Sequence, residues 1–447
     1  MDYEAAIQYL QSFSDFERTG SFTARPDLRP MLSLLARLED PQRGRLTVHV
    51  AGSKGKGSVC AMVESILRKA GFRTGLFTSP HLHSYRERVR VGGRPIAEET
   101  LARLTATLVP AVRAQMEADP ARRFVTFDLL TALGFLAFRE MEVQAQIMEV
   151  GLGGRLDSTN VFEETDVCVV TPVSLEHTEV LGETAEEIAR EKAAIARAGS
   201  ALVMGPQPFP EAAVEIRRAA DSAGAALVDV AADVGWERLA TDVDGQSFRI
   251  NIRGAAYRLW LPLLGEHQVE NAATAVACVD SLRQRGLPIA DEAIEQGLST
   301  IRWPGRLEVL ARSPLMIADS AHNRDSAKRL RLALSEIEPQ GPLWLVVGSS
   351  SGKDLGGLAE QLAPLAEGAV ATRSGHPRAM PPADVAAAFR REGMPVHIED
   401  TVAAALDRAV ECSAPDSLIC ITGSIFLAAE ARGRLLGIAD AAMWGES

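Results

Sequence analysis

The chain has 447 residues, too many for one ordinary hydrophobic core, so two or three packed units are expected. Hydrophobic residues make up 47% of the chain and charged residues 24%, the balance of a folded globular protein rather than a disordered one. The net charge of −12 argues against a surface that binds nucleic acid or an anionic membrane, although a local cluster of Lys and Arg could still hold an anionic substrate.

The sequence predicts a protein of a reducing compartment, and the cytoplasm is the simplest location. Asp2 and Glu4 are acidic where a secretory signal would be basic and then apolar. No apolar run reaches the roughly 18 residues that a membrane span needs. The cysteines are scattered and form no C-x-x-C pair, which predicts buried thiols rather than disulfides at Cys60, Cys168, Cys278, Cys412 and Cys420.

Apolar strand patterns alternate with helical patterns from residue 46 onward. The first strand, 46–51, is followed by a Gly-rich turn and a helix that runs to residue 70. Helices between apolar strands predict a mostly parallel sheet that is covered on both faces. Further strands are expected at 75–78, 146–150, 167–171 and 201–204, and further helices at 98–117, 127–141 and 184–198.

The pattern changes at 236–263, where polar and apolar residues alternate on both sides of an Arg-Gly turn. This segment predicts a β-hairpin inserted in the first domain. Two helices then lead to Pro304-Gly305, a candidate joint, which divides the chain into 1–303 and 304–447. The second, smaller α/β domain has expected strands near 315–319, 343–347, 368–372 and 417–422.

The turn at 50–58 has the composition of a phosphate-binding loop. Its glycines would let backbone N–H groups surround phosphate oxygens at a helix N-terminus, and Lys56 would reach the β- and γ-phosphates. It is not a strict Walker A motif, because Val50 replaces the first glycine and Gly57 separates Lys56 from Ser58. A plain Gly-rich turn with two solvated lysines is the alternative. The expected ATP contacts in the loop are Gly52, Ser53, Gly55, Lys56, Gly57 and Ser58.

The loop resembles the G-T-N-G-K-G-S signature of folylpolyglutamate synthases, with Ser53 and Lys54 in place of Thr and Asn. Further segments match in family order over nearly the whole chain. They are 77–82, 87–89, 149–157, 159–160, 176–177, 181–182, 191–193, 265–268, 271–273, 304–308, 319–323 and 422–424. The chain thus resembles the folylpolyglutamate/dihydrofolate synthase branch of the Mur ligases. The resemblance implies a P-loop ATPase domain that also binds folate, followed by a glutamate-binding α/β domain.

Glu149 ends an apolar strand and His177 lies just beyond the next one, so both side chains are expected beside the phosphate loop. Mg²⁺ usually takes one or two protein carboxylates together with phosphate oxygens and water. The residue chemistry alone suits Glu149 as a ligand and His177 as a group that orients water. The resemblance assigns Ser79, Glu149 and His177 to magnesium. A strand-end carboxylate and an ordinary loop histidine are the alternatives.

Lys192 follows Glu186, Glu187 and Glu191 on a predicted helix, which by itself indicates an i,i+4 ion pair. The resemblance implies instead that Lys192 carries a carbamate, which would turn a cation into an acidic group near magnesium. It also implies ATP and Mg²⁺ as cofactors and admits a monovalent cation. The expected catalytic residues are Lys56, His177, Lys192 and His322.

Three polar residues match family positions at the nucleotide. The Asn271 amide could read adenine edges, the Arg306 guanidinium could pair with phosphates, and the Asp319 carboxylate could accept from ribose hydroxyls. His322 and Ser424 match positions at the amino-acid side; a loop histidine and a helix N-cap are the alternatives.

The acceptor side departs from the family pattern. Asp15-Phe16 stands where Gly-Leu is usual before Glu17-Arg18, Asp128 stands where Glu is common, and 174–176 departs from Gly-Leu-Asp. These changes leave the identity of the acceptor open. The expected substrate contacts are Arg18, Pro80, His81, Thr126, Phe127, Asp128, Arg155, His322 and Ser424.

The resemblance implies that a folate-type carboxylate, from dihydropteroate or tetrahydrofolate, attacks ATP to give an acyl phosphate, which then reacts with L-glutamate. A monomer that binds only small molecules, without nucleic acid or membrane, is expected. The alternatives are a Mur-type ligase for another acid, a P-loop NTPase or kinase, and a catalytically silent relative.

Overall fold

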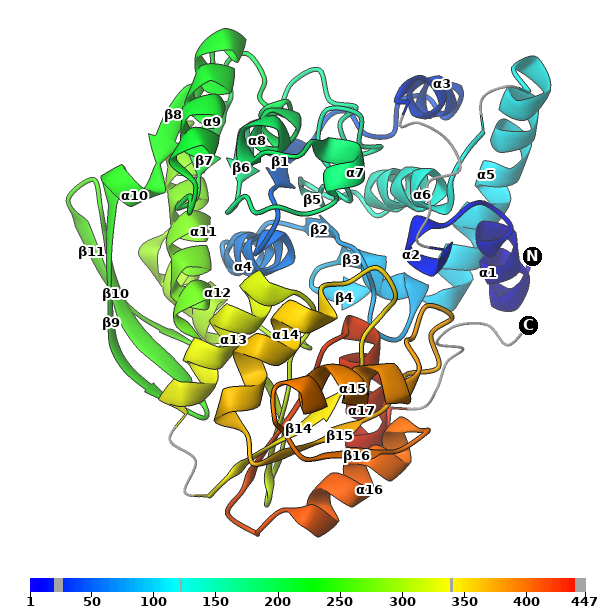
Figure 1. Ribbon diagram of the computed structural model, residues 1–447. Helices are drawn as coiled ribbons and strands as arrows, with labels where there is room; N and C mark the ends of the chain where they lie inside the picture. The colour runs from blue at the N-terminus through cyan, green and yellow to red at the C-terminus, as the bar shows by residue number, and fades with distance from the viewer. Residues whose placement is uncertain (20–26, 121–122, 338–340, 439–447) are drawn as a thin grey trace.

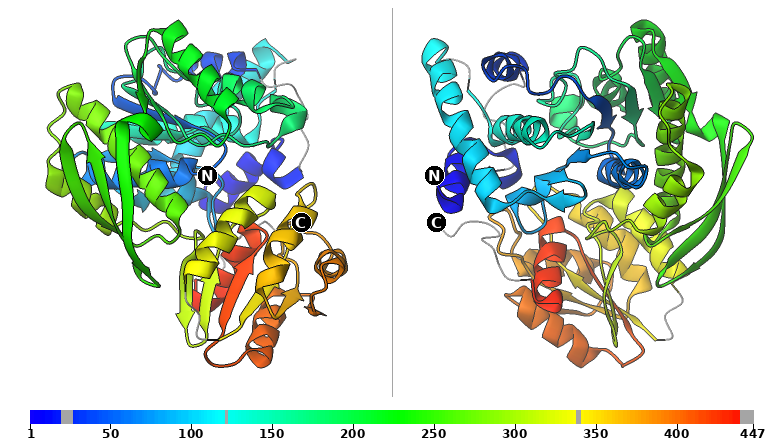
Figure 2. Two further views of the ribbon diagram at one scale, coloured as in Figure 1. Left: turned by 60° about the vertical axis from the view of Figure 1, so that its left-hand side comes forward. Right: turned by 180° about the vertical axis from the view of Figure 1, so that it is seen from behind.

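The computed structural model describes residues 1–19, 27–120, 123–337 and 341–438. Two α/β units lie one above the other, and a small antiparallel sheet flanks them on one side (Figure 1). In both views of Figure 2 the second α/β unit, coloured yellow to red, again lies beneath the first. The α/β class predicted from the sequence is confirmed. In the described part of the chain, no helix is long and apolar enough to cross a membrane.

The first sheet has eight strands, and the six from β2 to β8 in spatial order run parallel. The strands β3 and β4 are added antiparallel at one edge. Every strand predicted in this region is present, and β3, β4 and β8 were not predicted. In spatial order the strands are β4 (Arg94–Pro95), β3 (Val89–Val91), β2 (Thr74–Phe77), β5 (Ala145–Glu149), β1 (Leu46–Ala51), β6 (Val167–Val170), β7 (Ala201–Met204) and β8 (Ala226–Asp229).

Both faces of this sheet are buried, which explains why its strands are continuous apolar runs. In β6, Val167 and Val169 pack into the core on one face, while Cys168 and Val170 pack into the core on the other. The helix predicted at 184–198 ends earlier, at Ala193. The helices of this unit are α1 (Tyr3–Gln11), α2 (Phe16–Thr19), α3 (Arg29–Arg37), α4 (Lys56–Lys69), η1 (Tyr85–Arg88), α5 (Glu98–Ala118), α6 (Thr126–Glu140), α7 (Thr178–Leu181), α8 (Ala185–Ala193), α9 (Pro210–Ala223), α10 (Val230–Asp233), α11 (Glu266–Gln284) and α12 (Asp291–Ser299).

The predicted hairpin is part of a three-stranded antiparallel sheet of β9 (Val234–Asp242), β10 (Gly245–Ile252) and β11 (Ala255–Leu261). The hairpin itself is β10–β11, and β9 was not predicted. Phe248 and Leu259 are buried against the main core, whereas Arg249 and Trp260 face outward. Most of β9 is exposed or half-buried, so its apolar alternation is too weak to indicate a strand.

The second unit contains a six-stranded sheet that is parallel except for β12. Its four predicted strands are present, and the edge strands β12 and β16 were not predicted. The strands in spatial order are β12 (Glu308–Arg312), β13 (Leu315–Ala318), β17 (Leu418–Thr422), β14 (Leu343–Val347), β15 (Gly368–Ala371) and β16 (Val396–Ile398). The helices are α13 (Arg324–Glu336), α14 (Leu355–Leu362), η2 (Ala363–Leu365), α15 (Pro382–Arg391), α16 (Val402–Cys412) and α17 (Ile425–Leu436).

Polar contacts join the two units around the Pro304-Gly305 segment. Arg329 of α13 lies 3.4 Å from Glu270 of α11, measured from Nη1 to Oε2. Arg432 of α17 contacts the His83 ring at 3.0 Å and also pairs with Glu308 at 3.0 Å, directly after the joint. The division of the chain at residues 303 and 304 stays a prediction.

Candidate functional site

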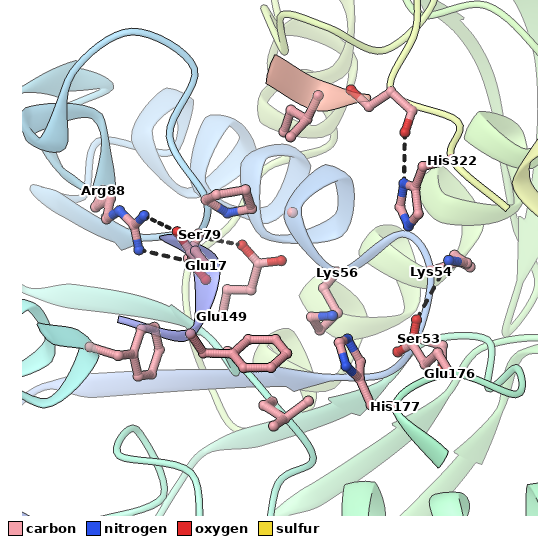
Figure 3. Close-up of a pocket in the computed structure, with 18 of the residues that line it drawn as sticks. Glu17, Ser53, Lys54, Lys56, Ser79, Arg88, Glu149, Glu176, His177 and His322 are labelled. Atoms are coloured by element: carbon pink, nitrogen blue, oxygen red, sulfur yellow. Dashed lines mark hydrogen bonds and ion pairs between the residues drawn. The ribbon is translucent and has the colours of Figure 1, made fainter. Parts of the chain in front are cut away.

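A cleft of about 600 Å³ lies between the two units and is lined by both. It opens at the carboxyl ends of the parallel strands, where open α/β sheets bind ligands. Figure 3 shows Lys56 between Glu149 and His177, with His322 reaching in from the second unit. The predicted residues that line the cleft are Ser53, Gly55, Lys56, Gly57, Ser58, Ser79, Pro80, Thr126, Phe127, Asp128, Glu149, His177, Lys192, Asn271, Arg306, Asp319, His322 and Ser424.

The phosphate loop connects β1 to the N-terminus of α4, and its shape requires glycine at two positions. Gly55 caps α4 with φ +86°, and a Cβ there would lie 2.3 Å from the Asn271 side-chain oxygen. A Cβ on Gly52 would lie 1.9 Å from the Thr171 hydroxyl. The close packing leaves the first turn of α4 facing the cleft, where its N–H groups and the helix dipole favour an anion.

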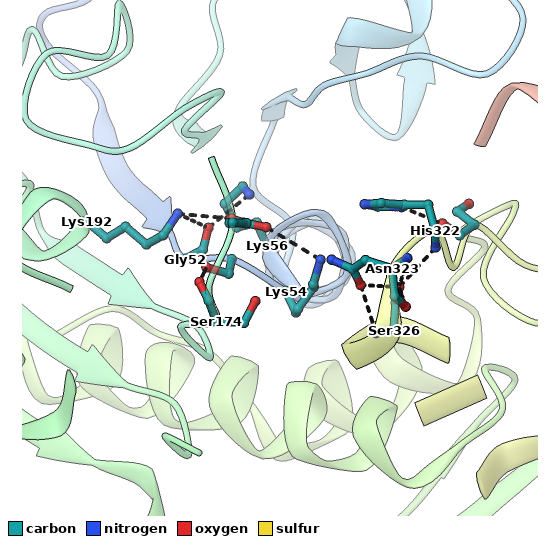
Figure 4. A network of polar contacts seen from close by, with 11 residues as sticks. Gly52, Lys54, Lys56, Ser174, Lys192, His322, Asn323 and Ser326 are labelled. Atoms are coloured by element: carbon teal, nitrogen blue, oxygen red, sulfur yellow. Dashed lines mark hydrogen bonds and ion pairs between the residues drawn. The ribbon is translucent and has the colours of Figure 1, made fainter. Parts of the chain in front are cut away.

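Two lysines donate to one carbonyl of this loop. Lys56 Nζ and Lys192 Nζ each lie 3.0 Å from the Gly52 carbonyl oxygen. Lys56 is on α4 and Lys192 on α8, so the two cations approach the loop from different helices (Figure 4). The carbonyl oxygen of Gly52 is therefore fixed from both sides.

Lys192 does not form the i,i+4 pair expected from its helix; its partner is Glu176, at 3.2 Å. Lys54 Nζ lies 3.5 Å from the second Glu176 oxygen. The Lys192 side chain is only 2% exposed, and burial lowers its pKa to about 8. Burial alone would raise the pKa of Glu176, but the charges of Lys192, Lys54 and Lys56 outweigh it and hold that pKa well below its usual value.

Glu149 lies beside the phosphate loop because β5 pairs in register with β1, Glu149 opposite Val50. Its Oε2 atom accepts a hydrogen bond of 3.0 Å from the Ser79 backbone N–H. The residue is 5% exposed, and burial raises the pKa of its carboxyl group. His177 follows β6 at a positive φ of 49°, and burial lowers the pKa of its ring to about 4. The three residues predicted for magnesium thus all line the cleft, with Lys56 between Glu149 and His177 (Figure 3).

The residues around Glu149 suit a magnesium ion that keeps several water ligands, rather than an ion held by protein ligands alone. In the part of the chain that the structure describes, no three His, Cys, Asp or Glu side chains group closely enough to hold a metal alone. A single buried carboxylate beside a phosphate-binding loop matches the preference of Mg²⁺ for one or two carboxylates plus phosphate oxygens and water.

The residues predicted to contact the nucleotide converge on the joint. Asp319 follows β13 and accepts from the backbone N–H groups of Leu307 and Ala321, at 3.1 and 2.8 Å. Arg306 donates to the Gly305 carbonyl at 3.1 Å and to the Ser320 hydroxyl. Asn271 lies directly against Gly55 of the phosphate loop. These contacts connect the loop, the joint and the second sheet.

His322 and Ser424 line the cleft from the second unit. His322 Nδ1 lies 2.9 Å from the Ser320 carbonyl oxygen, so the neutral ring donates from Nδ1 and keeps its acceptor nitrogen at Nε2. Burial, reinforced by Lys54 and Lys353, lowers the pKa of this ring to about 3. Ser424 caps α17 by accepting from the Phe426 N–H, so it is a helix N-cap as well as a lining residue.

Thr126, Phe127 and Asp128 line the cleft from the start of α6. The Thr126 hydroxyl donates to the Leu10 and Phe13 carbonyls, which ties the N-terminal helix to this wall. Asp128 accepts from the Ser158 hydroxyl and from its own capping N–H at Val125, and burial raises its pKa to about 6.

The raised pKa of Asp128 predicts a pH-dependent stability. The unfolded carboxyl has a pKa of about 3.9, so between about pH 4 and pH 6 the folded state binds more protons than the unfolded state. Stability from this group is present at low pH and lost as the pH rises through about 6. We expect the free energy of unfolding of the wild type, relative to Asp128→Asn, to fall by about 2 kcal/mol from pH 4 to pH 7. Urea titrations at both pH values measure it, and a pH-independent difference would contradict it.

Four predicted residues lie outside the lining of the cleft. Arg155 is 55% exposed and pairs with Glu191 at 2.9 Å, and His81 accepts from Arg88 at 2.9 Å. Within the phosphate loop, Gly52 packs against Thr171, and Arg18 adjoins residues outside the described part.

Six Lys or Arg residues that line the cleft were not predicted as site residues: Lys54, Arg88, Arg123, Arg329, Lys353 and Arg378. Arg88 is buried and pairs with Glu17, and Arg378 lies 5.9 Å from the centre of the Phe16 ring. Arg88 belongs to the family-matching segment 87–89, so this match could have indicated that Arg88 is a site residue. Lys353 and Arg378 lie in loops without a comparable pattern.

A phosphate loop faced by a second α/β unit across a shared cleft defines the class of two-domain Mur ligases. Residues 50–279 match the Mur ligase middle domain, and residues 305–425 match the Mur ligase glutamate ligase domain. The chain belongs to the folylpolyglutamate/dihydrofolate synthase family of Mur ligases. The resemblance seen in the sequence is therefore confirmed.

Relatives and solved structures agree on this family. The chain is 32% identical to a folylpolyglutamate synthase of Lacticaseibacillus casei, covering 98% of this chain and 99% of that one. It is 36% identical over 97% of its length to a probable bifunctional folylpolyglutamate synthase/dihydropteroate synthase of Haloferax volcanii, but spans only about half of that relative. A folylpolyglutamate synthase of Mycobacterium tuberculosis, solved with ADP and AMPPCP, superposes with a TM-score of 0.88 at 30% identity, covering 97% and 99% of the two chains. An Escherichia coli relative solved with DHPP and ADP gives 0.85 at 28% identity, covering 98% of each chain.

Proposed function

We propose that the chain is an ATP-dependent ligase that joins a folate-type carboxylate to L-glutamate and releases ADP and phosphate. The observation that carries the proposal is the single cleft in which Lys56 and Glu149 of the first unit face His322 of the second. A nucleotide on the loop and an acceptor at the Phe127 end would then meet between the units. Family membership supports the same activity.

In the first step, an oxygen of the acceptor carboxylate attacks the γ-phosphorus of ATP. A C–O–P linkage forms, the bond to the β-phosphate oxygen breaks, and ADP leaves. The negative charge is neutralised by Lys56 and the N–H groups at the start of α4. Asn271, Arg306 and Asp319 are assigned to the nucleotide.

We assign Glu149, Ser79 and His177 to hold magnesium, which neutralises charge on the β- and γ-phosphates when it is bound. The buried Glu149 carboxylate would supply the hard oxygen ligand. His177, whose ring is neutral at physiological pH because burial lowers its pKa to about 4, can orient a water molecule. Magnesium, a monovalent cation and the carbamate on Lys192 remain predictions from the resemblance.

In the second step, the amino group of glutamate attacks the acyl carbon. The C–N bond forms, the C–O bond to phosphate breaks, and phosphate takes the electron pair. The departing phosphate can take the proton that nitrogen loses, and the neutral His322 ring can orient the amino group by accepting a hydrogen bond at Nε2, its acceptor nitrogen. Closure of the two units at Pro304-Gly305 would keep water from the acyl phosphate.

Arg306 is expected to couple ATP use to closure, because it adjoins the joint and lines the cleft. In Arg306→Ala, we expect ATP hydrolysis to become uncoupled from amide formation or both to fall together. The ratio of ADP to amide product measures this, with Arg302→Ala as an exposed control just before the joint. Unchanged coupling with only a higher KM for glutamate would instead place Arg306 in the amino-acid site.

The departures at Asp15-Phe16 and Asp128 keep a second function open, a ligase for another carboxylic acid. ADP release and amide formation with dihydropteroate, tetrahydrofolate and a panel of amino acids distinguish the two. Amide product from a folate-type acid and glutamate supports the proposal. ADP release without amide in every mixture would favour an NTPase or kinase, and amide from another acid would favour the second function. The monomeric state and the cytoplasmic location remain predictions.

A further inference from the structure

The proposed reaction assigns no role to His49, a fully buried histidine on β1. His49 Nε2 lies 2.9 Å from the Thr159 hydroxyl oxygen. That hydroxyl in turn donates to Asp157 Oδ1 at 2.5 Å. Thr159 and Asp157 are also buried, and both belong to the loop between β5 and β6. We call these three residues the His49–Thr159–Asp157 network.

The direction of the hydrogen bonds in this network follows from the chemistry of its members. The Thr159 hydroxyl has one proton, which it donates to the Asp157 carboxylate, so its oxygen must accept from His49. Burial, reinforced by Arg197, lowers the pKa of the His49 ring to about 3, so the ring is neutral and its single proton is on Nε2. Among the described residues, His49 Nδ1 is buried without a hydrogen-bond partner. A bare acceptor nitrogen is tolerated there better than an unpaired N–H donor, which agrees with the same tautomer.

Asp157 connects the network to the lining of the cleft. Its other oxygen, Oδ2, accepts from the Leu152 N–H at 2.8 Å, and Asp157 itself lines the cleft. Gly151, the residue before Leu152, packs against the Phe127 ring so closely that a Cβ on Gly151 would lie 2.5 Å from a ring carbon. Phe127 is one of the predicted acceptor contacts. The orientation of the Asp157 carboxylate therefore helps to fix the backbone that supports this part of the cleft.

We propose that His49 is a positioning residue for the acceptor acid. Its Nε2–H, acting through the Thr159 hydroxyl, holds the Asp157 carboxylate in the orientation that the 151–157 turn requires. The proposal rests on the proposed function, because it assigns the part of the cleft beside Phe127 to the acceptor. His49 is not among the residues that line the cleft, so it acts only through the network.

The tautomer of His49 can be measured without any turnover. Long-range ¹H–¹⁵N correlation spectra of the ¹⁵N-histidine-labelled protein distinguish a protonated ring nitrogen from a bare one, and His49→Gln identifies the His49 signals. We expect a neutral ring with its proton on Nε2. A proton on Nδ1, or a charged ring at neutral pH, would overturn the proposal. Because no substrate is present, this failure is distinct from failure of the ligase assignment.

Hydrogen exchange of the resting protein tests the positioning. Glutamine at position 49 keeps a donor near the place of Nε2, whereas leucine fills a similar volume without a donor. In His49→Leu, the backbone amides of 151–159 should exchange at least about tenfold faster than in the wild type, and in His49→Gln they should stay within about threefold. If His49 only filled space, leucine would protect these amides as well as glutamine does. Equal exchange in the two variants, whether fast or slow, would overturn the proposal.

Turnover with dihydropteroate or tetrahydrofolate, ATP and glutamate tests the consequence for the acceptor. His49→Leu should raise the KM for the acceptor at least about tenfold and leave the KM for ATP within about twofold, and His49→Gln should restore most of the acceptor KM. Thr159→Val already breaks the network, so adding His49→Leu to it should raise the acceptor KM by less than about twofold further. His397→Gln, at an exposed histidine on β16, is the matched control. Equal rises in both KM values, or additive effects of the two substitutions, would overturn the role.

Discussion

Lys56→Ala is expected to lower kcat by at least about 100-fold and to leave the fold intact. In the resting protein Lys56 Nζ donates to the Gly52 carbonyl at 3.0 Å, and Lys192 donates to the same atom. The loop therefore keeps one of its two restraints, and the lost hydrogen bond is worth only about 1 kcal/mol. In the transition state, by contrast, no other side chain of α4 can bring a cation to the γ-phosphate.

ADP release measures this effect, and the thermal unfolding midpoint checks the fold. Lys69→Ala is the matched control, because Lys69 is exposed at the other end of the same helix. The control should match the wild type in both measurements. A folded Lys56→Ala protein with near-normal ADP release would remove Lys56 from the phosphate site.

The central parallel strands of the two larger sheets were predictable because both faces of each sheet are buried. A strand such as β6 (Val167–Val170) is apolar at every position, and that signal is strong in one sequence. The edge strands β9 and β16 were missed for the opposite reason, since they are largely exposed or half-buried. Their pairing is determined by the neighbouring strand, which a local pattern does not contain.

Site residues were predictable from the sequence where the order of strands in the sheet determines where their side chains lie. Glu149 and His177 follow strands on either side of β1, so strand order alone brings them to the phosphate loop. Side-chain pairing across long separations was not predictable. The helix around Lys192 was predicted to give an i,i+4 ion pair, but the residues four positions away are Ile188 and Ala196, and the buried side chain pairs with Glu176 after β6. Contacts of Lys353 and Arg378 with the cleft depend on how the second unit docks, which no local motif encodes.

Glu149→Gln is expected to lower turnover by about 100- to 1,000-fold, an effect like the loss of one charge-stabilising group. The amide has nearly the same shape and can still accept from the Ser79 N–H, which lies 3.0 Å from Oε2. The substitution removes the negative charge of the Glu149 carboxylate, which we propose binds magnesium. Raising Mg²⁺ should therefore restore part of the lost activity, and the variant should need more Mg²⁺ for half-maximal turnover.

Although Glu149→Gln should lose turnover, its free energy of unfolding should not fall. Burial raises the pKa of Glu149 above its unfolded value, so the folded carboxyl contributes stability at low pH that is lost as the pH rises through the raised pKa. At neutral pH the wild type carries the cost of a buried charge that glutamine lacks, and Glu149→Gln should be at least as stable. Glu163→Gln, 76% exposed, is the control for both measurements. A stable Glu149→Gln protein with wild-type turnover and an unchanged Mg²⁺ requirement would remove Glu149 from the metal site, whereas an unfolded variant would contradict the predicted stability.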